Sequence, residues 1–180
     1  MTPSADQKYA TLTDYLTGQT IPDVGAEANR QAVARFLVAR QGYTKSDIEV
    51  DVPIEMEIAG ERYASLVDLA VKIDNQYLMV IKCAAGSLGS REREVLAASR
   101  LLVGYQIPLA VVSDGHTALV FDTLTGKRQG QGLDAIPSRQ DLVAYARKHP
   151  PTPLAPERRQ REQLIFRSYD SMNVNVIRPQ

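Results

Sequence analysis

Residues 68–84 read D-L-A-V-K-I-D-N-Q-Y-L-M-V-I-K-C-A, two apolar runs joined by a polar turn at Asp74-Asn75. The pattern predicts a pair of antiparallel strands, with Asp68 on the first and Lys82 well inside the second. The two charged groups would then lie side by side within a sheet. Burying charge is costly unless the groups pair or take part in chemistry, so this stretch decides both the fold and the candidate site.

The flanking residues extend this pair into a three-stranded meander that follows a helix. Residues 27–41 carry apolar side chains at helical spacing and stop at Gly42, which predicts a helix. Residues 48–58 alternate apolar with charged or polar side chains, a pattern typical of a strand with one wet face, and Pro53 indicates a sheet edge. The other two strands of the meander are expected at residues 63–73 and 77–83.

The second half of the chain adds further helices and strands. Ser138, with Asp141 three residues later, predicts the cap of a helix that ends near His149. We expect a helix at 95–103, strands at 108–112 and 117–121, a stiff proline-rich linker at 150–156, a charged helix at 157–169 and a loose tail at 173–180.

These elements predict three parts of the chain. Residues 1–26 are expected to form an extended N-terminal arm with at most a short helical turn around residues 9–16. Residues 27–149 are expected to form one α/β domain, and residues 150–180 the linker, C-terminal helix and tail.

The composition excludes several classes of function. The 180 residues are 44% hydrophobic and 23% charged, enough for one good core. Lys plus Arg (21) balances Asp plus Glu (21), so binding to nucleic acid would need a local patch. No apolar run approaches the ~20 residues of a membrane span, and the single Cys83 cannot form an internal disulfide. We therefore expect a soluble, cytoplasmic protein that does not bind membranes.

Eight short motifs occur in order along residues 27–142. They are E-A-N-R-Q at 27–31, R-Q-G-Y at 40–43, V-P-I at 52–54, D-L-A-V at 68–71, V-I-K-C-A at 80–84, S-D-G at 113–115, L-V-F-D at 119–122 and I-P-S-R-Q-D-L at 136–142. The ordered set resembles the PD-(D/E)XK nuclease superfamily and, within it, the N-terminal nuclease domain of type I restriction enzyme R subunits. The resemblance implies an α/β fold, a mixed β-sheet flanked by helices on a restriction-endonuclease-like αβββαβ core.

The resemblance also implies a metal site, from which this sequence departs. In the family, an Asp on the second strand and a Glu-x-Lys on the third hold Mg²⁺ and orient the attacking water. Glu27 matches the family's first-helix glutamate and Asp68 its strand aspartate. Lys82, however, stands where the family has the Glu, and Ala84 where it has the Lys. An ammonium at this position removes a metal ligand and repels the cation.

Two interpretations of the site remain open. In the first, Lys82 has taken over the lysine role, Glu27 and Asp68 still bind Mg²⁺, and the protein is a Mg-dependent DNA endonuclease. In the second, which we favour, Asp68 and Lys82 form a structural ion pair where a metal used to bind, and no cofactor is expected. A solvated hairpin with both groups exposed conflicts with the apolar residues around them.

Basic residues suggest where DNA would bind. Arg91 and Arg93 follow a loop of small residues near the family's active-site face, so they are the first candidates for contacts with a DNA backbone. The last helix, with Arg158, Arg159, Arg161 and Arg167, follows Arg147 and Lys148 and offers a second candidate. Because acidic residues interleave with these arginines, we favour a solvated helix with i,i+4 ion pairs there.

The leading functional hypothesis is a stand-alone relative of the R-subunit nuclease domain. It has lost metal-dependent cleavage and acts as a DNA-binding or protein-interaction module. The alternative is the active endonuclease with Glu27, Asp68 and Lys82 in its site. A third class is an oligomerisation module that holds a partner or a second copy through the linker and last helix.

Overall fold

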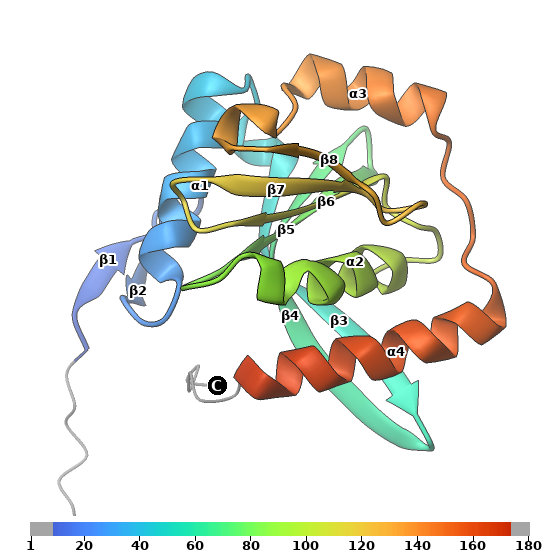
Figure 1. Cartoon of the computed structure of the whole chain (residues 1–180). Helices are drawn as coiled ribbons and strands as arrows, with labels where there is room; N and C mark the ends of the chain where they lie inside the picture. The colour runs from blue at the N-terminus through green and yellow to red at the C-terminus, as the bar shows by residue number, and fades with distance from the viewer. Residues whose placement is uncertain (1–8, 174–180) are drawn as a thin grey trace, which may run out of the picture.

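A six-stranded mixed sheet lies between two layers of helices in the computed structural model, which describes residues 9–173 (Figure 1). The strand order is β3-β4-β5-β6-β7-β8, in which only β5 and β6 run parallel. The strands are β3 (Ile48–Ile58), β4 (Glu61–Ile73), β5 (Gln76–Cys83), β6 (Leu109–Ser113), β7 (Ala118–Asp122) and β8 (Arg128–Gln131). The helices are α1 (Glu27–Arg40), α2 (Glu92–Leu101), α3 (Arg139–Lys148) and α4 (Pro156–Asp170).

The expected αβββαβ core is confirmed. It consists of α1, the β3-β4-β5 meander, α2 and β6, and α2 provides the crossover between the two parallel strands. β3 lies at the edge of the sheet, as Pro53 predicts. Proline lacks the backbone N–H that a strand between two neighbours needs for hydrogen bonding. Asp51 also interrupts this strand, with a left-handed φ of 50°. Along the rest of β3, exposed Glu55 and Glu57 alternate with buried apolar side chains.

The apolar residues form one core on each side of the sheet. On one side, α1 and α3 cover the sheet, and Leu37 and Leu142 are fully buried against it. On the other side, α2 and α4 cover the sheet, with Ala97 and Phe166 in the core. β6 and β7 are buried along their whole length because they lie between both layers.

The C-terminal helix α4 is part of this second layer. It lies along α2 and crosses the β3-β4 hairpin (Figure 1), where the Phe166 and Tyr63 rings meet edge to face. At the end of α4, the Tyr63 hydroxyl donates to Asp170 Oδ2 at 2.5 Å. At its middle, the buried Arg100 Nη1 of α2 donates to Glu162 Oε1 at 2.7 Å. The last helix therefore packs against α2 and the β3-β4 hairpin of its own chain, and the linker before it is hydrogen-bonded to Gln106.

The described part of the N-terminal arm is extended, as expected, but its two extended segments pair with each other, which the sequence did not predict. Residues 9–16 do not form a helical turn, because β1 (Thr11–Thr13) and β2 (Thr20–Pro22) pair as an antiparallel hairpin. The carboxylate of Asp14 accepts the backbone N–H groups of Leu16 and Thr17, which organises the turn between the two strands. Gly18 adopts a left-handed φ of 73° in the same turn.

The other differences concern element boundaries and one strand. β8 was not predicted, because its sequence R-Q-G-Q shows no apolar alternation, and it pairs with β7 at the sheet edge. α2 begins three residues earlier than expected, after a short 3-10 helix at Gly89–Arg91. The loose tail predicted from residue 173 onward lies almost entirely outside the described residues.

Candidate functional site

The Lys82 ammonium lies between two buried carboxylates. Its Nζ is 3.5 Å from Asp68 Oδ2 and 3.2 Å from Glu94 Oε1. Asp68 of β4 and Lys82 of β5 stand opposite each other, one residue beyond the paired Leu69 and Ile81. Glu94 comes from the first turn of α2. Asp68 is 3% exposed and Glu94 is 1% exposed. The expected pair of Asp68 and Lys82 is therefore present, and Glu94 makes it a triad.

The surroundings of Lys82 favour its charged form. Burial alone would lower the pKa of this ammonium, but the charges of Asp68 and Glu94, and of Asp170 on α4, outweigh burial and raise the pKa. Arg91 Nη1 lies 3.4 Å from the other oxygen of Glu94. The Cys83 backbone N–H donates to Asp68 Oδ2 at 2.8 Å. Each carboxylate is thus held by a cation and by a second donor, as buried charges require.

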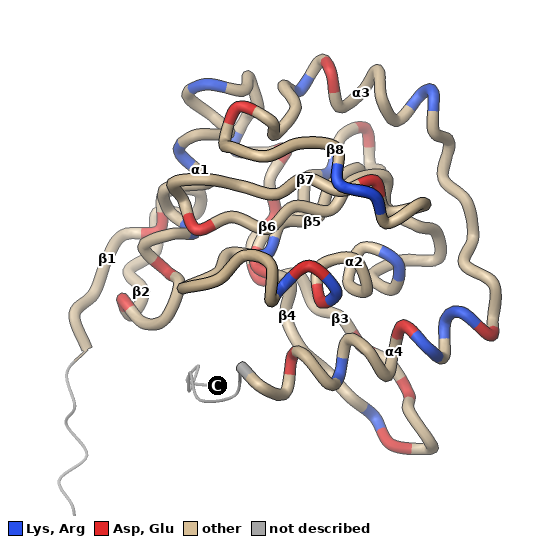
Figure 2. Tube along the Cα trace, viewed as in Figure 1, with Lys and Arg blue, Asp and Glu red and all other residues tan. Residues whose placement is uncertain are grey.

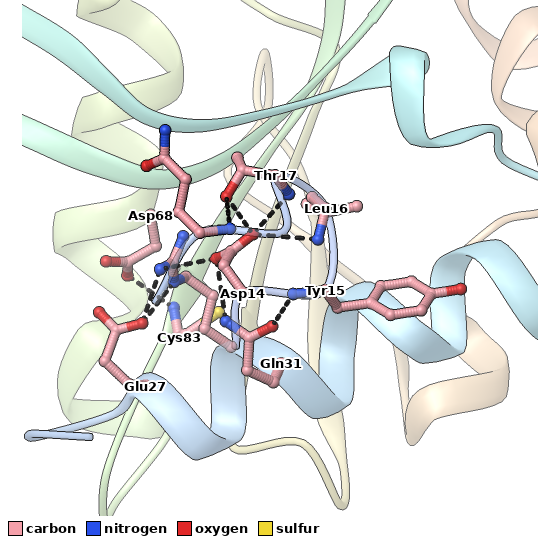
Figure 3. A network of polar contacts seen from close by, with 10 residues as sticks. Asp14, Tyr15, Leu16, Thr17, Glu27, Gln31, Asp68 and Cys83 are labelled. Atoms are coloured by element: carbon pink, nitrogen blue, oxygen red, sulfur yellow. Dashed lines mark hydrogen bonds and ion pairs between the residues drawn. The ribbon is translucent and has the colours of Figure 1, made fainter. Parts of the chain in front are cut away.

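A second polar cluster joins the start of α1 to the N-terminal hairpin (Figure 3). Glu27 opens α1, where the helix dipole favours a carboxylate, and its Oε2 lies 2.7 Å from Arg30 Nη2. The same guanidinium nitrogen lies 3.1 Å from Asp14 Oδ2. Gln31 Nε2 also donates to Asp14 Oδ2, and Gln31 Oε1 accepts the Tyr15 backbone N–H. Glu27 is therefore directed to Arg30 rather than to Lys82.

The two clusters meet at Cys83, beside which Figure 3 shows Glu27 and Asp68. Burial raises the pKa of the Cys83 thiol well above its usual value, and the charge of Asp68 adds to this effect. The cations Arg30 and Lys82 lower the pKa of this thiol, and the carboxylate of Glu27 raises it, but burial outweighs them. The candidate site thus consists of two charged clusters that adjoin Cys83, with side chains from the middle of β4, the end of β5 and the start of α1.

The network does not fit a divalent cation. The ammonium of Lys82 occupies the position between Asp68 and Glu94, and Arg30 holds Glu27. Within residues 9–173, no group of three or more His, Cys, Asp or Glu side chains is arranged to hold a metal ion. Ala84 is buried, and its carbonyl accepts from Asn29 Nδ2 at 2.8 Å.

The model of the family described as type I restriction enzyme R protein N terminus (HSDR_N) matches residues 25–137. The chain belongs to this family. The match spans α1 through β8, and hence Glu27, Asp68, Lys82 and Glu94. It leaves out the N-terminal hairpin that carries Asp14 and the α4 helix.

Comparison with curated proteins and with solved structures found no match. Across the described part of the chain, no helix combines the length and the apolar character that crossing a bilayer requires.

The predicted DNA-binding residues fall at the start of α2. Arg91 is partly buried and bound to Glu94, so it belongs to the charged network. Arg93, the second residue of α2, is exposed. The structure therefore brings Glu27, Asp68, Lys82 and Arg91 into one neighbourhood and leaves Arg93 facing solvent.

Three members of the network were not predicted from the sequence. Glu94 stands among apolar residues of α2, and a carboxylate on the apolar face of a helix is a signal that could have identified it. Arg30 follows Glu27 at i,i+3, a spacing that predicts an ion pair. Asp14 gives a local turn signal, but nothing near it in sequence indicates its hydrogen bond with Gln31 of α1, 17 residues away.

Asp14 should tie the hairpin to α1 in a pH-dependent way. Burial would raise the pKa of this carboxyl, but its hydrogen bonds with Thr17 and Gln31 and the charge of Arg30 together lower it below 3.8. A lowered pKa means that the stabilisation is present above the unfolded value and is lost as pH falls through the folded one. We expect Asp14→Asn to reduce the free energy of unfolding at pH 7, and this difference to shrink as the pH falls below about 3.8.

Urea unfolding of wild type and Asp14→Asn at pH 7, 5 and 3 measures this difference. Asp23→Asn, in the same segment, is the control for the loss of one carboxylate. A difference that stays constant down to pH 3 would contradict the role given to the Asp14 carboxylate.

Proposed function

We propose that this chain is a nuclease-fold domain that does not cleave by a metal-dependent mechanism and that binds DNA. The observation that supports the loss of cleavage is the Lys82 ammonium, 3.5 Å from Asp68 and 3.2 Å from Glu94. A carboxylate pair of this kind attracts a divalent cation by charge and by its hard oxygen ligands. Here a side chain of the protein supplies the positive charge.

The binding part of the proposal is supported by the family. The chain belongs to the family of type I restriction enzyme R protein N-terminal domains, and its resemblance to the PD-(D/E)XK nucleases implies DNA as the ligand. Losing the metal ligands does not remove the fold or its surface cations. Binding without cleavage is therefore the function that this site and this family support together.

A cleavage assay tests the proposal. Wild-type protein incubated with plasmid DNA and Mg²⁺ or Mn²⁺ should leave the DNA intact, and Asp68→Ala should behave in the same way. Cleavage by the wild type that disappears in Asp68→Ala would overturn the proposal and support the active endonuclease.

Exchanging the charges should create metal affinity. Lys82→Glu combined with Ala84→Lys places carboxylates at residues 68, 82 and 94 and moves the lysine to the family position. A ligand that binds the folded state alone stabilises it in proportion to RT ln(1 + [L]/Kd). We expect Mn²⁺ to raise the melting temperature of this variant and to leave that of the wild type unchanged.

Asp68→Asn added to the exchanged variant is the matched control, because it removes one oxygen ligand without changing side-chain size. It should abolish most of the Mn²⁺ effect. A wild type that Mn²⁺ stabilises as much as it does the exchanged variant would contradict the role of Lys82.

A further inference from the structure

Exposed cations lie on the first half of α4 and on the segment that leads from β7 into β8. Figure 2 shows Lys and Arg at both places. The five residues are Lys127 of the turn, Arg128 at the start of β8, and Arg158, Arg159 and Arg161 of α4, and we call them the α4 basic surface. All are exposed except Arg159, which is partly buried.

The turn and the helix are neighbours because they contact the same guanidinium. Arg100 donates its Nε and Nη2 to the Thr123 carbonyl, at the start of the turn, and its Nη1 to Glu162 of α4. A Cβ at Gly126 would lie 3.4 Å from Arg100 Nη2. Arg158 and Arg159 lie four and three residues before Glu162, so they are on the α4 face nearest this junction.

Within the described part of the chain, the cations in the first half of α4 lack the acidic partners that a solvated helix would give them. Glu162, which could pair with Arg158 at i,i+4, is buried and bound to Arg100. Among the described residues, Arg158, Arg159 and Arg161 form no ion pair, although Glu157 stands four residues before Arg161. Arg128 reaches Glu92 only at 4.0 Å. The sequence prediction of i,i+4 ion pairs on this helix was therefore wrong, because its ion pairs among the described residues join it to α2 and to β4.

The surface is held in place before any partner arrives. Pro156 opens α4, Glu162 anchors its middle, and the backbone of Thr152 in the linker accepts the N–H of Gln106. Ordering flexible segments is one of the main costs of association. Cations on an anchored helix and a short turn avoid much of that cost.

The chemistry of the surface fits phosphate groups. Arginine guanidinium groups match phosphate oxygens in geometry and charge, and phosphate contacts position proteins on DNA. A membrane-binding helix would instead need an apolar face toward the lipid. The apolar side chains Ile165 and Phe166 of α4 pack into the core, which leaves Leu164 exposed among polar residues.

We propose that the α4 basic surface contacts the phosphate backbone of DNA. This inference rests on the proposed function and locates its binding surface. The surface includes α4, which lies outside the residues that the family model matches. Its three arginines on α4 therefore lie outside the matched part of the chain, whereas Lys127 and Arg128 lie within it.

Fluorescence anisotropy with a labelled DNA duplex at several salt concentrations tests the inference. The patch variant is Arg158→Gln with Arg161→Gln, and both side chains are exposed and unpaired among the described residues. The matched control is Arg40→Gln with Arg62→Gln, which removes the same charge elsewhere. We expect the patch variant to bind about tenfold or more weakly at low salt. The slope of log K against log salt should be shallower by roughly 0.9 for each phosphate that the variant no longer neutralises.

A third variant, Arg91→Gln with Arg93→Gln, separates this surface from the start of α2. If that variant loses binding and the patch variant does not, the inference is overturned and the proposed function stands. If the wild type shows no salt-dependent binding to DNA, both are overturned. Tighter binding to vesicles rich in phosphatidylserine than to DNA would also overturn the inference. Thermal unfolding of each variant confirms that it is folded.

Discussion

Replacing Lys82 with methionine should lower the free energy of unfolding by about 3–5 kcal/mol, the range for removing one partner of a buried ion pair. Methionine fills a similar volume, but it leaves Asp68 and Glu94 without the cation between them. Urea unfolding at pH 7 measures the change. Lys72→Met is the control, because its pair with Glu49 is only partly buried and should be worth at most about 1 kcal/mol.

Neutralising the two carboxylates should rescue the Lys82 variant. Lys82→Met combined with Asp68→Asn and Glu94→Gln removes the uncompensated charge, so most of the lost stability should return. A Lys82→Met protein as stable as the wild type would contradict the triad. It would mean that the two carboxylates tolerate burial without the ammonium.

The pH dependence of the Lys82 contribution has a definite sign. The pKa of Lys82 is raised in the folded state, so its contribution is fully present below the unfolded value of about 10.5. The contribution is lost only as the pH rises through the folded-state value. The difference in unfolding free energy between wild type and Lys82→Met should therefore be constant from pH 7 to 9 and should begin to fall above about pH 10.5.

Arg100→Met is the second variant with a large expected effect. Arg100 is the buried cation that joins α2, the Thr123 carbonyl and Glu162 of α4. Its removal leaves a buried carboxylate and a buried carbonyl without donors, which should cost about 3–5 kcal/mol. The loss should be largest in α4, so hydrogen exchange of the α4 amides should accelerate more than that of the β6 amides.

Arg62→Met is the matched control, since Arg62 pairs with Glu55 on the surface and should contribute less than about 1 kcal/mol. Equal acceleration of exchange in α4 and β6 after Arg100→Met would show that Arg100 supports the whole domain rather than anchoring α4. An unchanged exchange rate in α4 would contradict the anchoring role.

The sequence predicts the core of this fold because local patterns and tertiary demands agree there. Alternation marks β3, two apolar runs mark β4 and β5, and helical spacing marks α1. β8 has no such pattern, and its existence depends on pairing with β7. The hairpin before α1 likewise depends on Asp14 finding Gln31 and Arg30, contacts that appear only after the chain has folded.

The site was predictable to the extent that it follows strand register. Asp68 and Lys82 face each other because β4 and β5 pair, and that pairing can be read from the turn between them. Glu94 required knowing how α2 rotates against the sheet. Its place among Val95, Ala97 and Ala98 was the clue that a charged group is buried there.

The two interruptions of β3 affect how the molecule behaves in a crowded solution. An open strand at a sheet rim is a template for neighbouring molecules, and stacking on such templates leads to cross-β fibres. Pro53 has no backbone N–H, and Asp51 has a left-handed φ. The hydrogen-bonding groups along this edge strand are therefore interrupted, and a strand of another molecule cannot pair with them regularly. The exposed Glu55 and Glu57 of β3 would also repel the same residues of a second copy. The protein should therefore resist fibrillar aggregation from this rim at concentrations that would endanger an unguarded sheet.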